Sequence, residues 1–290
     1  MKCNLCPRRC GAERDRRAGV CGVGDKIKIA RAMLHMWEEP SISGERGSGA
    51  IFFSGCVLGC VYCQNREISH ERYGEEITEG ELADIMLDLQ SQGAHNINLV
   101  SPTQFADKIR ASIDLIRDKL KIPVVYNTGG YELPEEIAKM SGYVDIFLTD
   151  MKYYSSEASR KYSRASDYFE NARESLKEMV KIAPECVFDE NGLMKKGVIV
   201  RHLVLPTLRA DSIRVLDEIK KAVDVSKIRL SLMSQYTPDF CPDEYKEIKR
   251  KITTFEYQSV VEHALSLGYE GYIQEKTSAS VRFTPKFKKD

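Results

Sequence analysis

Short apolar runs alternate with longer amphipathic segments along most of the chain. The runs have the length of buried strands, and the segments between them carry apolar side chains at helical spacing. The pattern predicts six strands and a short seventh run, at residues 50–54, 96–100, 123–127, 145–149, 198–205, 228–233 and 271–275. Strands that alternate with helices in this order form a parallel sheet with helices packed on it.

The first predicted helix carries clear boundary signals. Thr78 followed by Glu81 forms a capping box, and Gly93 can end the helix. Apolar positions on one face of the first, second and fifth helices are Leu82, Ile85, Met86 and Leu89, then Phe105, Ile109, Ile113, Ile116 and Leu120, then Ile213, Leu216 and Ile219. Before the fifth strand, the sequence predicts a hairpin that turns at Asn191-Gly192.

Six strand–helix units are two short of the eight that close a barrel. The chain therefore predicts an α/β fold, either a partial parallel barrel or an open doubly wound sheet, and both place chemistry at the C-terminal strand ends. We expect a Cys-rich appendage at residues 1–25, and a connecting segment at 26–48 with a small strand pair and a Gly/Ser loop. The core is expected at residues 49–275, followed by a tail at 276–290.

The overall charge excludes some classes of partner. The 290 residues include 43 Lys and Arg and 43 Asp and Glu, so no net field attracts nucleic acid or acidic lipid. No run approaches the roughly 18 apolar residues of a membrane span, and the N-terminus lacks the apolar stretch of a signal peptide. We expect a cytoplasmic globular protein that binds neither nucleic acid nor membrane.

Cysteine is concentrated near the N-terminus, where seven of the nine cysteines fall in the first 63 residues. This distribution favours metal ligation over disulfides. Four of these residues, Cys3, Cys6, Cys10 and Cys21, supply a complete thiolate set for zinc or for a 4Fe-4S cluster, and a metal-free tail is the third alternative. Outside this region, Cys186 and Cys241 are expected to be packing residues.

Three further cysteines, Cys56, Cys60 and Cys63, follow the first predicted strand within eight residues. Thiolates are soft ligands, and three on a tight loop can converge on one face of an iron–sulfur cube, whereas a disulfide would leave the third unpaired. A structural zinc ion takes four protein ligands, so it would need one from elsewhere. A cluster held by three cysteines keeps one iron open for a substrate or cofactor.

The run CVLGCVYCQNR, residues 56–66, resembles the CxxxCxΦC signature of radical S-adenosylmethionine (SAM) enzymes, with Tyr62 as the aromatic residue. Its continuation CQNR is similar to the pyruvate formate-lyase activating-enzyme branch. The order of later motifs resembles the activating-enzyme-like iron–sulfur proteins within that branch. The resemblance is strong over residues 49–66 and looser over 49–275, and it implies the partial (β/α)6 barrel of the radical SAM core.

The resemblance implies a 4Fe-4S cluster on Cys56, Cys60 and Cys63, with SAM bound to the open iron. An electron from a donor such as flavodoxin or ferredoxin would split SAM, and the 5′-deoxyadenosyl radical would abstract a hydrogen atom from the substrate. The branch suggests a glycyl radical partner protein as that substrate. One alternative is modification of a small molecule or peptide; another is an iron–sulfur or zinc protein that binds partners or carries electrons without cleaving SAM.

Candidate SAM contacts follow the predicted strand ends. The family's Gly-Gly-Glu turn is absent after the second strand, where Ser101 and Thr103 stand instead, either as a helix cap alone or as a cap that also binds SAM. After the third strand, Asn127 and Thr128 resemble the Asp-Thr of activating enzymes, although Asn127 replaces an acidic residue. The resemblance therefore covers these two positions only in part.

Later strands supply three more candidates. Asp150 and Lys152 match the family's Asp-x-Lys pattern, and Arg201 resembles its strand-five arginine. Because Arg201 lies inside an apolar strand, it needs a partner such as a carboxylate or ribose oxygens. His202, which would face the other side of the strand, is expected to be structural. Further candidates for the same cavity are Gln235 and Tyr236.

The segment around Trp37, which includes Glu38 and Glu39, precedes the cysteine loop. We expect an edge strand and a turn there, and a direct role at the substrate cavity is the alternative.

Overall fold

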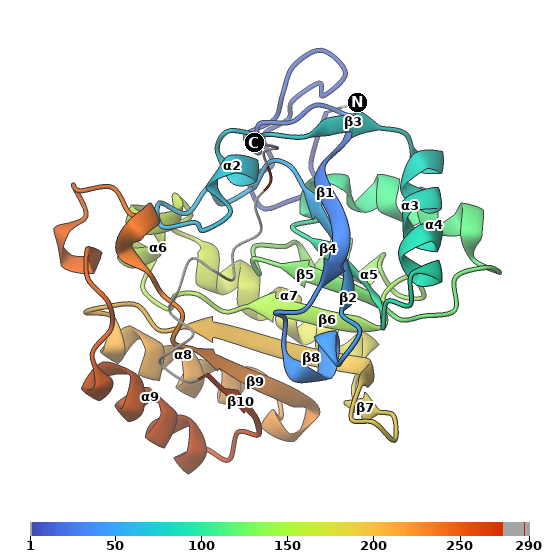
Figure 1. Ribbon diagram of the computed structural model, residues 1–290. Helices are drawn as coiled ribbons and strands as arrows, with labels where there is room; N and C mark the ends of the chain where they lie inside the picture. The colour runs from blue at the N-terminus through green and yellow to red at the C-terminus, as the bar shows by residue number, and fades with distance from the viewer. Residues whose placement is uncertain (1, 275–286, 288–290) are drawn as a thin grey trace.

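The computed structural model describes residues 2–274 and 287. One sheet runs through the molecule in the strand order β10-β9-β8-β6-β5-β4-β2-β1-β3 (Figure 1). Seven neighbouring strands are parallel: β2 (Ser48–Phe53), β4 (Ile97–Val100), β5 (Val124–Thr128), β6 (Ile146–Asp150), β8 (Met194–Leu203), β9 (Ile228–Met233) and β10 (Gly271–Ile273). Within the described residues the two sheet edges do not pair with each other, so the barrel is partial and unclosed.

The helices complete the six predicted units. Those that follow the parallel strands are α3 (Glu79–Ser91), α4 (Ala106–Ile116), α5 (Pro134–Ala138), α6 (Ser156–Ser163), α7 (Tyr168–Ile182), α8 (Arg209–Ala222) and α9 (Thr254–Ser266). Short α-helical turns are α1 (Pro40–Ser43) and α2 (Arg66–Ser69), and 3-10 turns are Thr103–Phe105, Val225–Lys227, Pro238–Phe240 and Lys246–Ile248. The prediction of a partial parallel barrel is confirmed.

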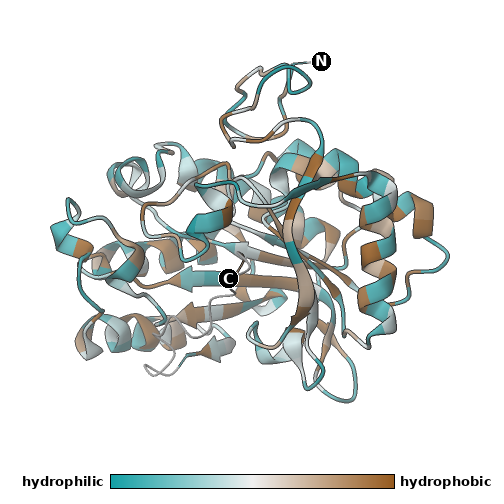
Figure 2. Ribbon diagram, turned by 45° about the horizontal axis from the view of Figure 1, so that its top comes forward, coloured by the Kyte–Doolittle hydropathy of each residue, from teal (hydrophilic) through white to brown (hydrophobic). Residues whose placement is uncertain are grey.

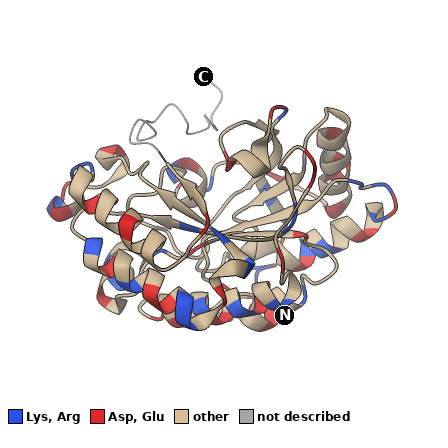
Figure 3. Ribbon diagram, turned by 90° about the horizontal axis from the view of Figure 1, so that it is seen from below, with Lys and Arg blue, Asp and Glu red and all other residues tan. Residues whose placement is uncertain are grey.

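The main core lies between the sheet and its helices. Alternate strand residues point toward this layer and pack against the apolar faces of the helices, among them Ile51, Phe53, Leu99, Tyr126, Phe147, Val200 and Leu230. The strands at the centre are predominantly hydrophobic in Figure 2. Many of the charged residues in Figure 3 lie along the helical layer. This distribution is what burial of one helical face and exposure of the other require.

Several local predictions are confirmed. Thr78 accepts a hydrogen bond from the backbone of Glu81 and Glu81 caps Thr78 in return, so the capping box that begins α3 is present. Gly93, with φ of 90°, follows the end of this helix. The hairpin also exists, because β7 (Val187–Phe188) pairs antiparallel with β8, and Gly192 donates to Asp189 in its turn.

The connecting segment differs from its prediction. Instead of a small strand pair of its own, residues 26–48 contribute β1 (Ile27–His35), which pairs antiparallel with β2 and, on its other side, with β3 (Glu75–Ile77). After β1 the chain passes under the face of the sheet that is turned away from the helical layer. We call this face of the partial barrel the concave face. There Ile42 of α1 packs against buried residues of the parallel strands, namely Val125, Ile146, Leu148 and Ile199.

No helix among residues 2–274 and 287 combines the length and the apolar character needed to cross a membrane. The predicted tail at residues 276–290 lies outside the described residues except for Phe287. The ring of Phe287 packs on Phe52, with 5.2 Å between the ring centroids.

Candidate active site

The cysteine loop begins where β2 ends. Gly55 has a φ of 82°, and a Cβ there would lie 2.7 Å from the carbonyl oxygen of Cys21, so both the backbone conformation and the contact require glycine. Beyond it, the backbone N–H of Cys63 donates to the carbonyl of Cys60 (3.1 Å). Ser163 donates to the sulfur of Cys60 (2.9 Å). These contacts fix the loop on the C-terminal side of the sheet.

Burial controls the chemistry of these thiols. It raises the pKa of Cys60, and together with the neighbouring thiols Cys60 and Cys56 it raises the pKa of Cys63 to about 12. Because thiolates are the metal-binding form, a bound cation would have to supply the positive charge that makes ionisation favourable here.

No group of three or more His, Cys, Asp and Glu side chains in the described part of the chain is arranged so that it could hold a metal ion. The fit to a 4Fe-4S cluster rests on donor chemistry. Three soft thiols lie on one loop, and the charges of Cys56 and Cys60 both act on Cys63. The assignment of Cys56, Cys60 and Cys63 as ligands stays a prediction.

The predicted aromatic residue anchors this loop. Tyr62 is buried, and its hydroxyl hydrogen-bonds to that of Tyr153 (2.5 Å), which in turn bonds to Ser163 (2.9 Å), the donor to Cys60. The ring of Tyr236 packs edge-on against Tyr62 at 5.8 Å. The structure therefore gives Tyr62 and Tyr236 a role in holding the loop, while Gln235 accepts a hydrogen bond from Gln64 through its backbone (3.3 Å).

A row of polar residues crosses the concave face. Strand register places Asp150, Arg201, Ser231 and Tyr272 opposite one another on β6, β8, β9 and β10. Asp150 lies two residues after Leu148 on β6, and Arg201 lies two residues after Ile199 on β8. Leu148 and Ile199 pack on α1, and side chains two residues apart on a strand point to the same side, so Asp150 and Arg201 also point to the concave side.

Arg201 stands at the centre of this row. Its guanidinium pairs with Asp150 through Nε (3.0 Å) and with Glu38 through Nη1 (3.1 Å), and it donates to Asn127 through Nη2. Lys152 pairs with the other oxygen of Asp150 (2.5 Å). The structure thus brings together four predicted SAM-site residues, Asn127, Asp150, Lys152 and Arg201, and supplies the carboxylate partner that Arg201 was expected to need. Their contacts to SAM stay a prediction.

The charges of this group are strongly coupled. Burial alone would raise the pKa of Asp150, but Lys152 and Arg201 outweigh it and hold that pKa below its ordinary value. Burial likewise opposes ionisation of Arg201, yet Asp150, Glu39 and Glu38 raise its pKa. Asp150, Lys152 and Arg201 are therefore ionised together in the folded protein.

The position of Glu38 and Glu39 was not predicted from the sequence. Glu38 accepts hydrogen bonds from Asn98 (3.0 Å) and Asn127 (3.2 Å) in addition to its pair with Arg201. It comes from the turn after β1, where a turn was expected but contact with the concave face was the disfavoured alternative. The one available signal was Arg201 itself, since a buried guanidinium requires an acidic partner somewhere in the chain.

Ser101, Thr103 and Thr128 have other partners. Thr103 donates to Glu132 (2.5 Å), and Thr128 donates to the same carboxylate oxygen. Burial raises the pKa of Glu132 to about 7 although both hydroxyls donate to it. Ser101 has a positive φ of 58° at the end of β4. The prediction of a cap is wrong, because neither residue caps α4 with its side chain. Their contact with SAM stays a prediction, and Glu132 was missed.

The N-terminal cysteines lie against the cysteine loop. The carbonyl of Cys21 accepts a hydrogen bond from the backbone N–H of Cys56 (3.1 Å). A Cβ on Gly19 would lie 3.4 Å from the sulfurs of both Cys10 and Cys21, so these two thiols lie close to the same point. The N-terminal segment lies at the same end of the sheet as α2 (Figure 1). The metal on Cys3, Cys6, Cys10 and Cys21, and the predicted domain boundaries, stay predictions.

Three residues that were predicted to have structural roles pack against other parts of the protein. Cys241 is buried in the main core, and Cys186 packs against the apolar cluster beneath the sheet. His202 is buried on the helical side of β8, and its Nδ1 bonds to the carbonyl of Met151 (2.6 Å). Burial lowers its pKa to about 4, so the ring is neutral at neutral pH.

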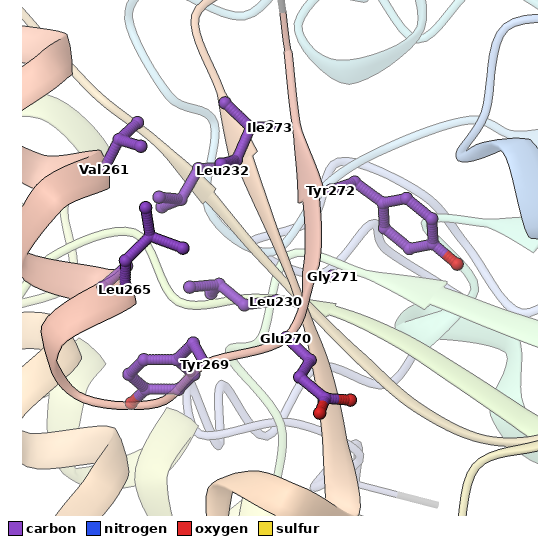
Figure 4. Close-up of a pocket in the computed structure, with 10 residues that line it drawn as sticks. Leu230, Leu232, Val261, Leu265, Tyr269, Glu270, Gly271, Tyr272 and Ile273 are labelled. Atoms are coloured by element: carbon purple, nitrogen blue, oxygen red, sulfur yellow. The ribbon is translucent and has the colours of Figure 1, made fainter.

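An apolar pocket lies elsewhere, between β9, β10 and α9 (Figure 4). Its walls include Leu230, Leu232, Val261 and Leu265, which face the helical layer. It is not part of the concave face, from which it is separated by the sheet.

The fold and the cysteine loop define an α/β protein of the partial-barrel class. Residues 50–196 match the profile of the Radical SAM superfamily. The uncharacterized protein MJ0674 from Methanocaldococcus jannaschii is 30% identical over 274 residues, which cover 90% of this chain and 74% of that protein. The chain belongs to the radical SAM superfamily.

Solved structures agree with this fold. A radical SAM methyltransferase from Sphaerobacter thermophilus superposes with a TM-score of 0.51 at 11% identity, covering 78% of this chain and 66% of that one. SuiB from Streptococcus suis, bound to S-adenosylmethionine, gives 0.52 at 15% identity, covering 76% and 48%. The chain thus spans less than two thirds of these solved chains, and at such identities the likeness shows the fold alone.

Proposed function

We propose that this protein binds a 4Fe-4S cluster and SAM and abstracts a hydrogen atom from a small molecule or peptide. The observation that carries the proposal is the juxtaposition of the cysteine loop with the charged strand ends. A Cβ on Gly129 would lie 3.0 Å from Leu58 of the loop and 3.7 Å from the Cε of Lys152. Lys152 also acts electrostatically on Cys60. Thiols and cations of this kind suit a cluster and the carboxylate of SAM.

The chain's own residues would bind and orient. When bound, the cluster supplies one electron to SAM, whose cleavage gives methionine and a 5′-deoxyadenosyl radical. Lys152 and Arg201 would hold the SAM carboxylate, and Asp150 keeps both cations in position. The aromatic group around Tyr62 and the segment at residues 2–24 would limit the access of water to the loop.

Both ends of the concave face are covered by other parts of the chain, which favours a small substrate over a large one. Residues 37–43 lie beneath this face, and residues 2–24 pack on the cysteine loop at its other end. Activation of a glycyl radical partner, with flavodoxin or ferredoxin as the electron donor, has the CQNR continuation as its support and stays a prediction. That function would require an opening wide enough for an extended glycine loop of the partner.

The central test is reductive cleavage of SAM. Protein reconstituted anaerobically with iron and sulfide, reduced with dithionite and given SAM, should release 5′-deoxyadenosine and methionine. The Cys60→Ala variant should lose the cluster and this activity, but it should retain any metal on Cys3, Cys6, Cys10 and Cys21. Absence of cleavage by wild-type protein with a verified cluster would exclude the proposed chemistry, and loss of both metals in the variant would refute two separate sites.

A further inference from the structure

Three buried hydroxyl groups lead to the sulfur of Cys60. The hydroxyl of Tyr62 bonds to that of Tyr153 (2.5 Å), and the hydroxyl of Tyr153 bonds to that of Ser163 (2.9 Å). Ser163 in turn bonds to the sulfur of Cys60 (2.9 Å). Tyr153 and Ser163 are fully buried, and Tyr62 is 6% exposed. These three residues form a hydroxyl chain that ends on a predicted cluster ligand and is shielded from solvent.

Backbone contacts hold Ser163 against the cysteine loop. Ser163 is the last residue of α6. The carbonyl of Tyr162, just before it, accepts a hydrogen bond from the backbone N–H of Val61 (2.9 Å), which follows Cys60. The carbonyl of Ser163 accepts another from the side chain of Arg8 (3.1 Å). Because both acceptors are backbone carbonyls, the end of α6 keeps its place beside Cys60 when the hydroxyl of Ser163 is removed.

The direction of the hydroxyl chain follows from the number of hydrogens in it. A hydroxyl has one hydrogen to donate, and a thiolate sulfur has none, so Cys60 can only accept when it ligates a metal. Ser163 must then give its hydrogen to Cys60, and Tyr153 must give its own to Ser163. For the same reason Tyr62 donates to Tyr153. All three hydrogens therefore point toward the sulfur, and hydrogen bonds aligned in this way strengthen one another.

We propose that Ser163 raises the reduction potential of the 4Fe-4S cluster by donating a hydrogen bond to Cys60, and that Tyr153 and Tyr62 orient and strengthen this donor. Reduction adds a negative charge to a cluster and its thiolates, so a donor to a ligating sulfur stabilises the reduced form more than the oxidised form. Ser163 acts through Cys60, which makes it a positioning residue. The inference rests on the proposed function, because it takes Cys60 as a ligand of the cluster.

The same helix provides a matched control for Ser163 and another for Tyr153. Ser159 is 1% exposed, and its hydroxyl donates to a backbone carbonyl of α6 (3.2 Å) instead of a sulfur. The ring of Tyr162 stacks on that of Tyr153 at 6.4 Å, but its hydroxyl donates to Glu247 (2.7 Å). Ser159→Ala and Tyr162→Phe therefore each remove one hydroxyl without interrupting the hydroxyl chain.

The experiment is a redox titration of anaerobically reconstituted protein without SAM, in which an electrode sets the potential and visible absorbance reports reduction of the cluster. The Cys60→Ala variant supplies the signal of any second metal site, which is subtracted. Ser163→Ala should lower the ratio of reduced to oxidised cluster at a fixed potential by roughly tenfold, which is about 59 mV for a one-electron couple. Tyr153→Phe should shift the potential in the same direction by less, because Ser163 keeps its hydrogen but loses its own donor. Ser159→Ala and Tyr162→Phe should titrate as wild type does.

An unchanged or higher potential in Ser163→Ala would overturn the inference, and so would an equal shift in Ser159→Ala. A shift in Ser163→Ala without any in Tyr153→Phe would refute the part of the two tyrosines. If Ser163→Ala does not hold the cluster, Tyr153→Phe against Tyr162→Phe decides.

This experiment separates the inference from the proposed function, because the potential is measured without SAM. Wild-type protein that holds a cluster but does not cleave SAM would refute the proposed function, while the effect of Ser163 on the potential is still measured. An unchanged potential in a Ser163→Ala variant that cleaves SAM would refute the inference alone.

Discussion

Among single residues, Arg201 joins three charged and polar groups on the concave face. It contacts Glu38, Asp150 and Asn127, which come from three separate parts of the chain. Replacement by leucine leaves two buried carboxylates without their guanidinium. We expect Arg201→Leu to lower the free energy of unfolding by about 3–5 kcal/mol, measured by urea denaturation.

A surface arginine provides the comparison for this variant. The side chain of Arg16 is 77% exposed and pairs with the nearby acidic residues Glu13 and Asp15. Arg16→Leu should change the free energy of unfolding by about 0.5 kcal/mol or less. Similar losses in the two variants would show that the ion pairs of Arg201 contribute no more than surface pairs.

Glu132 makes stability depend on pH. Its pKa is about 7 in the folded protein against an ordinary value of 4.5. Between these pH values the folded state binds more protons than the unfolded state, so the free energy of unfolding falls as the pH rises from about 4.5 to about 7. Glu132→Gln removes this dependence. Relative to wild type, the variant should gain on the order of 3 kcal/mol between about pH 4.5 and pH 8.

Urea denaturation of both proteins across this range checks the prediction. If the difference between wild type and Glu132→Gln stays constant with pH, the carboxyl group does not titrate as described.

The residue-level predictions succeeded where one side chain revealed its own requirement. Arg201 in an apolar strand indicated a buried polar partner, and Asp150 is such a partner on the neighbouring strand. Glu38 could not be found in this way, because it lies 163 residues from Arg201 and no local pattern connects the two. The same holds for Glu132, whose position between Thr103 and Thr128 depends on how two strand ends meet.

At the scale of elements, the loop after β5 depends on a close backbone contact. Gly130 has a φ of 82°, and a Cβ there would lie 2.0 Å from the carbonyl oxygen of Asp150. Gly130→Ala must therefore displace the end of β6, which carries Asp150 and leads to Lys152. We expect a loss of about 3 kcal/mol in the free energy of unfolding and weaker binding of SAM.

Gly142 is a control that shares the positive φ of Gly130 but not its close contact. It has a φ of 78°, but nothing lies within 4 Å of the position of its Cβ. Gly142→Ala should cost only about 1 kcal/mol and leave SAM binding unchanged. Thermal unfolding and SAM titration of both variants test the distinction, and equal effects of the two substitutions would contradict it.

The elements predicted from sequence were those with local signals. Apolar runs located the parallel strands, and the capping box located the start of α3 because both of its partners lie within four residues. The pairing of β1 with β2 and β3 was not predicted, since the sequence of a strand does not identify the strands with which it pairs. The path of residues 37–43 beneath the sheet was missed for the same reason.

For the whole molecule, the position of the N-terminal segment matters most. Arg8 fastens it to the body by donating to the carbonyls of Val57 (2.8 Å) and Ser163 (3.1 Å). We expect Arg8→Ala to loosen this cover, so that air bleaches the visible absorbance of the reconstituted cluster faster, on the order of tenfold or more.

The neighbouring arginine is the matched control. Arg9 is exposed and pairs with Glu135 (2.9 Å), a contact that does not involve the cysteine loop. Arg9→Ala should bleach at the wild-type rate. Equal rates in all three proteins would mean that residues 2–24 do not shield the loop.

The ion pair between Glu38 and Arg201 has a consequence for any shortened form of the gene product. The segment that matches the superfamily profile, residues 50–196, contains neither partner. A fragment trimmed to begin at residue 49 would keep Arg201 but remove the strand beside β2 and the acid opposite the guanidinium. The part of this protein shared with its whole superfamily is therefore not a self-sufficient unit, because its interior is completed from the stretch upstream.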